Sequence, residues 1–308
     1  MTNSNVSLDD KYSIESGRIF VTGVQALARI PMVQRQRDVL EGLNTAGFIS
    51  GYRGSPVGGF DQQLWRAKKF LEQNHIRFQP GLNEDLAASA IWGSQQTNLH
   101  EGGKYDGVFA IWYGKGPGVD RCGDVFKHGN MSGPAKHGGV LLIAGDDHAA
   151  KSSTVPHQSE YAFMDASIPV VNPAGLQDIV DYGILGFAMS RFSGCWVAFK
   201  TTAENMDSSA SIDVSPDRVQ ISLPKFDMPE GGLSIRWPDD WIEQEHRLHQ
   251  YKLNAVRAFA RQNKIDKTII NSQNPKLGVV TTGKSYLDVR QALEDLGINE
   301  AKADKIGL

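Results

Sequence analysis

The chain has 308 residues, of which 32 are basic and 35 acidic, so its formal net charge at pH 7 is −3. This length allows two average domains, or one large α/β domain with part of another, and the balanced charge excludes the basic surface of a nucleic-acid-binding protein. The two cysteines, Cys122 and Cys195, are too few for a four-thiolate metal or iron–sulfur site. Scarce cysteine is typical of a reducing compartment, so we expect a cytoplasmic protein. The polar N-terminus does not resemble a secretory signal, and the most apolar long stretch, 182–192, is too short to span a bilayer.

Apolar runs alternate with amphipathic stretches along the first two hundred residues. The spacing of apolar residues predicts helices over 23–45, 60–74, 86–99 and 174–192. Short apolar runs between them predict strands at 46–51, 76–79, 108–113, 140–144, 169–171 and 195–199. Continuous apolar runs are typical of strands that are buried on both faces of a parallel sheet. We therefore predict an α/β fold with a doubly wound, mostly parallel sheet.

The composition changes after about residue 203. Turn-forming residues are frequent over 204–238, and 241–262 predicts one long charged helix. A polar stretch then precedes an apolar run at 277–281, a predicted strand, and a predicted helix at 285–296. Because one strand and helix cannot close a core, we expect a fragment that ends in the first unit of a second α/β domain. The expected division is an N-terminal tail (1–19), a main α/β domain (20–205), a connection (206–274) and the truncated second domain (275–308).

Glycine is frequent, at 32 of 308 residues, and the glycines gather where predicted strands end. One group follows the strand at 46–51, and a second group follows the strand at 108–113: Gly51, Gly54, Gly58 and Gly59, then Gly114, Gly116 and Gly118. Glycine lets the backbone approach a ligand closely, and ligands of open α/β sheets bind at the carboxyl ends of the strands. The alternative is that these glycines only form tight turns.

The segment 80–93 contains the most informative acidic residue. Asn83 is a good helix N-cap, which places Glu84 and Asp85 in the first turn of the following helix. Acidic residues there complement the helix dipole, which is a sufficient structural reason for them. Glu84 also follows a predicted strand and therefore lies at the edge where ligands bind. From these residues alone, a structural role and a catalytic role both remain open.

Two further patterns suggest other chemistry. The segment 278–285 matches the P-loop spacing Gly-x-x-x-x-Gly-Lys-Ser, but the residues before Gly278 are polar and do not form the strand that precedes a P-loop. His246 and His249 share one face of the predicted long helix, as a metal site requires, although a solvated charged face explains them better. Ser55 is followed by Pro56, which does not match the G-x-S-x-G turn of serine hydrolases. The alternatives kept open are a P-loop nucleotide-binding protein and a non-catalytic module with the same fold.

Several segments, in register, resemble the thiamine-diphosphate-dependent 2-oxoacid:ferredoxin oxidoreductases, and in particular the long fused form of indolepyruvate ferredoxin oxidoreductase. Gly51–Pro56 is similar to the family's Gly-Tyr-Pro-Gly-Thr-Pro loop, and Asn83-Glu84 to its Asn-Glu segment. Lys115–Asp120 resembles its Lys-His-x-Gly-Leu-Asn segment. The pattern continues through Gly138–Asp147, Ser152-Ser153 and Ile168–Val170. The resemblance covers about 20–205, and 277–308 resembles the opening of the family's next domain.

The resemblance implies thiamine diphosphate as the cofactor and the fold of the family's N-terminal, pyrimidine-binding domain. Glu84 would be catalytic, because its counterpart hydrogen-bonds and activates the aminopyrimidine ring. The other expected cofactor-binding residues are Tyr52, Gly54, Ser55, Pro56, Gly116 and Gly118, and the expected substrate contacts are Arg53, Lys115 and Asp120. Arg53 replaces a proline of the family, and its guanidinium is suited either to a substrate carboxylate or to an acid that anchors its own loop.

The reaction implied by the resemblance is the oxidative decarboxylation of a 2-oxoacid, expected to be indolepyruvate or another arylpyruvate, to its acyl-CoA. The expected partners are therefore the 2-oxoacid, coenzyme A, ferredoxin and a second copy in a homodimer, without nucleic acid or membrane. Mg²⁺ and iron–sulfur clusters are expected on segments outside this chain, and no metal ligand is assigned here. We expect the 308-residue chain to be inactive alone.

Overall fold

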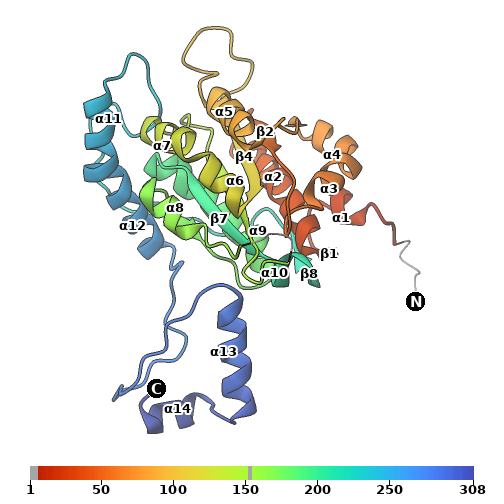
Figure 1. The fold of residues 1–308 in the computed structure, drawn as a ribbon, viewed down its shortest axis with the longest axis vertical. Helices are drawn as coiled ribbons and strands as arrows, with labels where there is room; N and C mark the ends of the chain where they lie inside the picture. Colours follow the sequence, from red (N-terminus) through yellow and green to blue (C-terminus); the bar gives the residue numbers. More distant parts are fainter. Residues whose placement is uncertain (1–5, 152–154) are drawn as a thin grey trace.

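The computed structural model describes residues 6–151 and 155–308. A six-stranded sheet with the order β3-β2-β4-β5-β7-β6 forms its centre (Figure 1). Every neighbouring pair in this sheet is parallel. The strands are β2 (Ala46–Gly51), β3 (Ile76–Phe78), β4 (Val108–Lys115), β5 (Val140–Asp146), β6 (Val170–Val171) and β7 (Val197–Thr202). The predicted parallel α/β sheet is confirmed, with each strand close to its predicted position.

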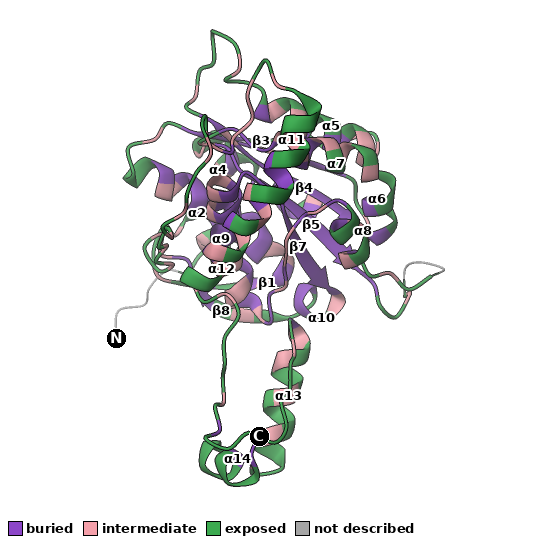
Figure 2. Ribbon diagram, turned by 90° about the vertical axis from the view of Figure 1, so that its left-hand side faces the viewer, coloured by how far each residue is buried: buried purple, intermediate pink, exposed green. Residues whose placement is uncertain are grey.

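Helices cover both faces of the sheet because the central strands are apolar on both sides. Ile111 and Tyr113 of β4 face one core, and Ala110 and Trp112 face the other. The first core is covered by α2 (Gly23–Leu40), α3 (Phe60–Arg66), α4 (Lys68–Gln73) and α9 (Leu176–Ser193). The second is covered by α5 (Glu84–Gln95), α6 (Gly116–Arg121), α7 (Gly123–Ser132) and α8 (Glu160–Asp165). Figure 2 shows the buried strands between these two layers.

Short elements that the sequence pattern did not predict complete the domain. The strands β1 (Arg18–Thr22) and β8 (Ser209–Asp213) pair in an antiparallel ribbon apart from the main sheet. Two four-residue helices, α1 (Asp10–Ser13) and α10 (Ala203–Met206), flank this ribbon in sequence. The two strands of this ribbon are about two hundred residues apart in sequence. The ribbon therefore joins the start of the chain to the segment after β7.

The C-terminal third differs from the prediction in two ways. The long helix is divided into α11 (Trp241–Arg247), a π-helical turn η1 (Leu248–Lys252) and α12 (Leu253–Gln262). The predicted strand at 277–281 is wrong: the segment is extended but pairs with no described strand, and Val280 is 99% exposed. A strand needs a neighbour for its backbone hydrogen bonds. The helices that follow, α13 (Lys284–Asp295) and α14 (Glu300–Ile306), lie away from the sheet (Figure 1).

The π-helical turn brings a buried lysine against the end of α7. The Nζ of Lys252 donates hydrogen bonds to the carbonyl oxygens of Asn130 (3.2 Å) and Met131 (2.7 Å), in the last turn of that helix. An ammonium group there complements the helix dipole and satisfies carbonyls that have no partner within the helix. Burial lowers the pKa of Lys252 to about 8. Lys252 therefore fastens the segment α11–η1–α12 to α7 at the cost of desolvating a charge.

We expect Lys252→Met to remove a pH dependence of stability. The pKa of Lys252 is about 8 in the folded chain, whereas the ordinary value of 10.5 applies to the unfolded chain. The unfolded state therefore holds the proton more tightly. Between these values the folded state loses up to about 1.4 kcal/mol for each unit by which the pH falls. Urea unfolding should therefore show the wild type gaining stability relative to Lys252→Met as the pH is raised through this range. A constant difference between the two proteins would contradict the assignment.

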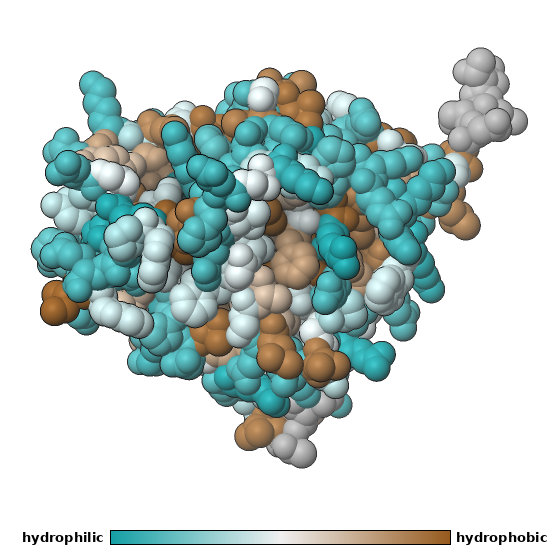
Figure 3. Space-filling model, turned by 90° about the horizontal axis from the view of Figure 1, so that it is seen from above, coloured by the Kyte–Doolittle hydropathy of each residue, from teal (hydrophilic) through white to brown (hydrophobic). Residues whose placement is uncertain are grey.

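Among the residues that the structure describes, no helix is long and apolar enough to cross a bilayer. The end of the molecule opposite α13 and α14 is drawn in Figure 3, where hydrophilic side chains cover most of the face and hydrophobic ones form smaller, separate groups. This end therefore does not present one continuous apolar face.

Candidate functional site

The chain leaves β2 and β4 in opposite directions, although these strands are neighbours. β2 leads outward to β3, whereas β4 leads to β5 on the other side. Such a reversal marks the topological switch point of a doubly wound sheet, and ligands bind there at the carboxyl ends of the strands. The loop 51–59 follows β2, and α6 follows β4. The two predicted glycine-rich turns therefore flank the position where the fold favours a ligand.

The loop after β2 closes over the ends of the neighbouring strands. The backbone N–H of Tyr52 donates to the carbonyl oxygen of Tyr113 in β4, at 3.0 Å. Gly54 lies against Lys115, because a Cβ at Gly54 would be 2.8 Å from the Cδ of that side chain. The lysine has polar or charged interactions of its own. These contacts bring two predicted site segments, 52–56 and 115–120, together.

Within this loop, the predicted residues differ in exposure. Pro56 packs beside Gly145, where a Cβ would lie 2.9 Å from the Cδ of the proline. Tyr52, Arg53 and Ser55 are exposed. In the described part of the chain Arg53 makes no hydrogen bond or ion pair, so the structure does not use it to anchor the loop.

Glu84 is the first residue of α5 and is half-buried. The helix begins there because the Oδ1 of Asn83 accepts a hydrogen bond from the backbone N–H of Leu86 (2.9 Å), which confirms the predicted N-cap. No described residue makes a hydrogen bond or ion pair with the Glu84 carboxylate, whereas that of Asp85 accepts a 2.9 Å bond from Arg121 Nε. Of the two acids in this turn, Glu84 is thus the one left available for a ligand.

The helix α6 closes one side of Glu84. A Cβ on Gly118 would lie 2.6 Å from the Cγ of Glu84 and 2.9 Å from its Oε1, so only glycine leaves room for the carboxylate. The backbone carbonyl of Glu84 accepts a hydrogen bond from the Nε1 of Trp112, at 3.1 Å. Cys122, at the end of α6, is fully buried, and burial together with the charges of Asp85 and Glu84 raises the pKa of its thiol. The thiol therefore remains protonated and unreactive near neutral pH.

The contact between Gly118 and Glu84 gives a direct prediction. Gly118→Ala places a methyl group inside the space of the Glu84 side chain, so the carboxylate must move. A displacement of about 1 Å at a catalytic group costs roughly 100-fold in rate. For the catalytic role that the resemblance implies for Glu84, we expect a loss of this order in kcat, with thermal stability changed little. Gly123→Ala is the matched control, since no atom lies within 4 Å of its Cβ position; equal losses in both variants would contradict the assignment.

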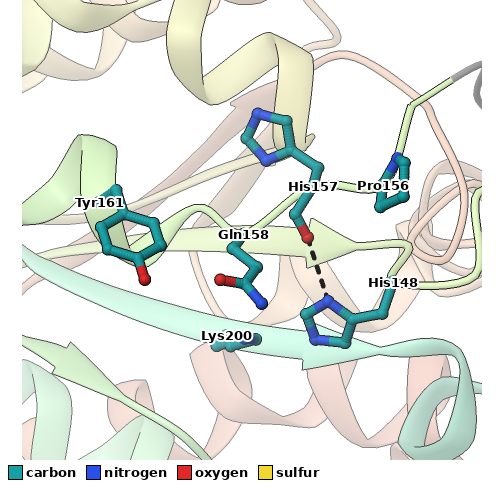
Figure 4. Close-up of a pocket in the computed structure, with 6 residues that line it drawn as sticks. All are labelled: His148, Pro156, His157, Gln158, Tyr161 and Lys200. Carbon is teal, nitrogen blue, oxygen red and sulfur yellow. Dashed lines mark hydrogen bonds between the residues drawn. The ribbon is translucent and has the colours of Figure 1, made fainter.

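A cavity of about 540 Å³ opens beside this region, at the carboxyl ends of β5 and β7 (Figure 4). It is lined by His148, Pro156, His157, Gln158, Tyr161 and Lys200. The Nδ1 of His148 lies 3.1 Å from the carbonyl oxygen of His157, which fixes the two sides of the entrance relative to each other. The sequence contained both histidines but offered no ligand spacing that joined them.

An ion-pair network surrounds Lys200, one of the residues that line the cavity. Asp146, the last residue of β5, is fully buried and accepts hydrogen bonds from the backbone N–H (2.9 Å) and the Oγ (2.5 Å) of Ser159. Lys200 lies 3.5 Å from Asp146 and also pairs with Glu160. Burial acts to raise the pKa of Glu160, but hydrogen bonds from Lys200 and the backbone, together with the nearby positive charges of Lys200 and His148, outweigh it, and the pKa lies below its usual value. The charge of Lys200 is thus held between two carboxylates.

The remaining sequence predictions have separate outcomes. Asp120, an expected substrate contact, is bound to His157. Ser152 and Ser153 lie outside the described residues.

In the segment with P-loop spacing, 278–280 is not part of a strand and Lys284 pairs with Asp288, so the geometry of a P-loop is not present. No group of three or more His, Cys, Asp or Glu side chains within 6–151 and 155–308 is arranged to hold a metal ion.

The fold is similar to that of a solved 2-oxoglutarate:ferredoxin oxidoreductase from Magnetococcus marinus, with a TM-score of 0.62 and 15% sequence identity, over 92% of this chain and 52% of that one. Residues 267–308 match the family model of the indolepyruvate oxidoreductase domain. The chain is 24% identical to the indolepyruvate oxidoreductase subunit IorA of Pyrococcus abyssi over 304 residues, and 23% identical to that of Methanothermobacter thermautotrophicus over 290 residues.

These matches cover 94% and 92% of this chain but 41% and 42% of the two relatives, so the chain spans about two fifths of their length. The class defined by the fold is that of a parallel α/β domain, similar to one found in a 2-oxoacid:ferredoxin oxidoreductase. The chain is thus similar in sequence to indolepyruvate oxidoreductase subunits and in fold to a 2-oxoacid:ferredoxin oxidoreductase, which confirms the resemblance predicted from its motifs.

Proposed function

We propose that this chain forms the pyrimidine-binding part of a thiamine-diphosphate-dependent 2-oxoacid oxidoreductase, with Glu84 as the residue that activates the aminopyrimidine. The observation that supports this most strongly is the half-buried Glu84 carboxylate at the switch point of the sheet. Among the described residues it has no polar partner, and a glycine leaves room beside it. A structural helix cap would not require Gly118 to be small.

The residues present suit one edge of a heterocyclic cofactor. Glu84 offers a carboxylate to a ring nitrogen, and Gly118 leaves room for that carboxylate. Gly116 is covered by the ring of His157, so its cofactor contact rests on the resemblance alone. The exposed ring of Tyr52 provides apolar surface on the opposite loop. The described residues lack a carboxylate group arranged for a divalent cation. As the resemblance implies, the proposal assigns the diphosphate and its Mg²⁺ to segments outside this chain.

When bound, thiamine diphosphate supplies the electron sink for decarboxylation. The role of Glu84 is to hold a proton between its carboxylate and the ring nitrogen. Packing of α6 against Glu84 excludes part of the surrounding water, which strengthens such a hydrogen bond. Arg53, which has no ion pair among the described residues, is placed on the adjacent loop to attract the carboxylate of a 2-oxoacid.

The finer parts of the proposal rest on the family. The relatives are named as indolepyruvate oxidoreductases, and we extend an aryl 2-oxoacid substrate to this chain on that basis. Coenzyme A and ferredoxin as partners, iron–sulfur clusters on other segments, a homodimer and a cytoplasmic location belong to the same proposal.

The test is a steady-state assay of the full-length protein with thiamine diphosphate, Mg²⁺, coenzyme A and an artificial one-electron acceptor. We expect reduction of the acceptor that depends on the cofactor and on a 2-oxoacid, with indolepyruvate preferred over 2-oxoglutarate. Cofactor-independent activity, or none with any 2-oxoacid, would refute the proposal.

A further inference from the structure

We propose that His157 is a positioning residue that locks α6 against the sheet and thereby holds the wall beside Glu84. The inference deepens the proposed function and rests on it for its catalytic consequence. His157 lies on the segment between β5 and α8, far from Glu84 in sequence. No motif connected it with the turn after β4.

His157 contacts both ends of α6. Its Nε2 lies 2.8 Å from the Oδ2 of Asp120, near the end of the helix. Its ring covers Gly116 at the start of the helix, where a Cβ would lie 2.1 Å from Nδ1 and 2.2 Å from Cγ. A glycine is therefore required at the first position of α6 for the imidazole to occupy this place. The ring acts as a clamp that spans the helix from Gly116 to Asp120.

The clamp is itself fixed to the sheet. The Nδ1 of His157 is 3.7 Å from the Oδ1 of the fully buried Asp146. The ring nitrogen is buried and makes no hydrogen bond with any described residue. Asp146 is held by Ser159 and Lys200, so the end of β5 is a rigid support for the ring. The His157 side chain is only 17% exposed, which limits its freedom to swing away.

The clamp acts on the wall of the site through a short path. Gly118 lies between Gly116 and Asp120, the two residues of α6 that His157 contacts, and it is the residue pressed against the Glu84 carboxylate. On its other side α6 is held to α5 by the ion pair of Arg121 with Asp85, which is more exposed and therefore weaker. Loss of the His157 contact would leave α6 with this exposed pair and the core packing of Val119, so that its polar attachment to the end of β5 is lost.

The first test measures how well α6 protects Cys122 from a thiol reagent, and it needs no cofactor. The two cysteines of the chain are both fully buried, and Cys122 directly follows α6 whereas Cys195 precedes β7. In His157→Phe, which keeps a ring over Gly116 but loses the hydrogen bond to Asp120, we expect iodoacetamide to label Cys122 about tenfold faster. Labelling of Cys195, followed by peptide mass spectrometry, should not change. His157→Gln, which keeps an N–H donor for Asp120, should restore most of the protection.

The second test reads the consequence in the holoenzyme. We expect the kcat of His157→Phe to fall about 10- to 100-fold, with recovery in His157→Gln. His128→Phe is the matched control, because His128 pairs with the exposed Asp124, and a phenylalanine ring can keep its stacking on Trp92. Unchanged labelling of Cys122 in His157→Phe, or equal losses in the phenylalanine and glutamine variants, would overturn the proposal. If the wild type has no cofactor-dependent activity but Cys122 is labelled faster in His157→Phe than in the wild type, the proposed function is refuted and the positioning role of His157 stands.

Discussion

Replacing Glu84 with glutamine is expected to lower the kcat of the holoenzyme by roughly 100- to 10,000-fold, the usual contribution of a positioned acid–base group. The amide keeps the size of the side chain, and the backbone carbonyl of residue 84 still accepts the bond from Trp112. Only the ability to hold a proton on the cofactor's ring nitrogen is lost. The measurement is steady-state kinetics at saturating cofactor. Calorimetry measures the cofactor affinity separately, so that a loss of chemistry can be distinguished from a loss of binding.

The control for this variant is Glu300→Gln. Glu300 opens α14 in the same way that Glu84 opens α5, after an asparagine cap whose Oδ1 accepts from the backbone N–H three residues later, Asn299 from Lys302 at 3.0 Å. Both glutamates complement a helix dipole, but only Glu84 lies at the carboxyl edge of the parallel sheet. Similar kinetics for the two variants would reduce Glu84 to a structural role.

The second large effect is on stability, and it concerns the ion pair that joins α2 to α9. Arg191 makes two parallel bonds to the carboxylate of Asp38, at 2.6 and 2.8 Å, and Asp38 is only 1% exposed. Thr45 and Gln34 also donate to this carboxylate. Asp38→Ala leaves a mostly buried guanidinium without its counter-charge, and we expect the free energy of unfolding to fall by about 3–5 kcal/mol.

Urea unfolding of Asp38→Ala and Asp165→Ala tests this expectation. Asp165 pairs with Lys127 at 2.6 Å, but both side chains are about half exposed or more, so its loss should cost about 1 kcal/mol or less. If the two variants lose the same stability, burial of the Asp38 pair does not have the effect assigned to it.

The parallel sheet was predictable because its strands are continuous apolar runs that only burial on both faces explains. Glu84 was predictable as a candidate for a similar reason: a cap at Asn83 fixes the start of α5 within one residue. The two glycine turns were predictable as a pair because parallel strands bring their carboxyl ends to one edge. These features depend on local pattern and on general rules of connection, which a single sequence contains.

The parts that could not be predicted depend on contacts between distant segments. Nothing local in 18–22 or 209–213 indicates that these strands pair with each other. The π-helical turn places Lys252 inward by a shift in register that periodicity does not reveal. His157 reaches α6 only because the segment after β5 returns to the same edge of the sheet. A signal was nevertheless present, since Asp146 and Asp147 stand at the end of a predicted buried strand, where charged residues require partners.

The most direct test of the central claim is the structure of the holoenzyme with thiamine diphosphate bound, and within it the distance from the Glu84 carboxylate to the nearest nitrogen of the aminopyrimidine ring. We predict a hydrogen bond, at about 2.6–3.2 Å, with Gly118 in contact with the same carboxylate. A pyrimidine ring held by other residues, with Glu84 turned to solvent, would contradict the account.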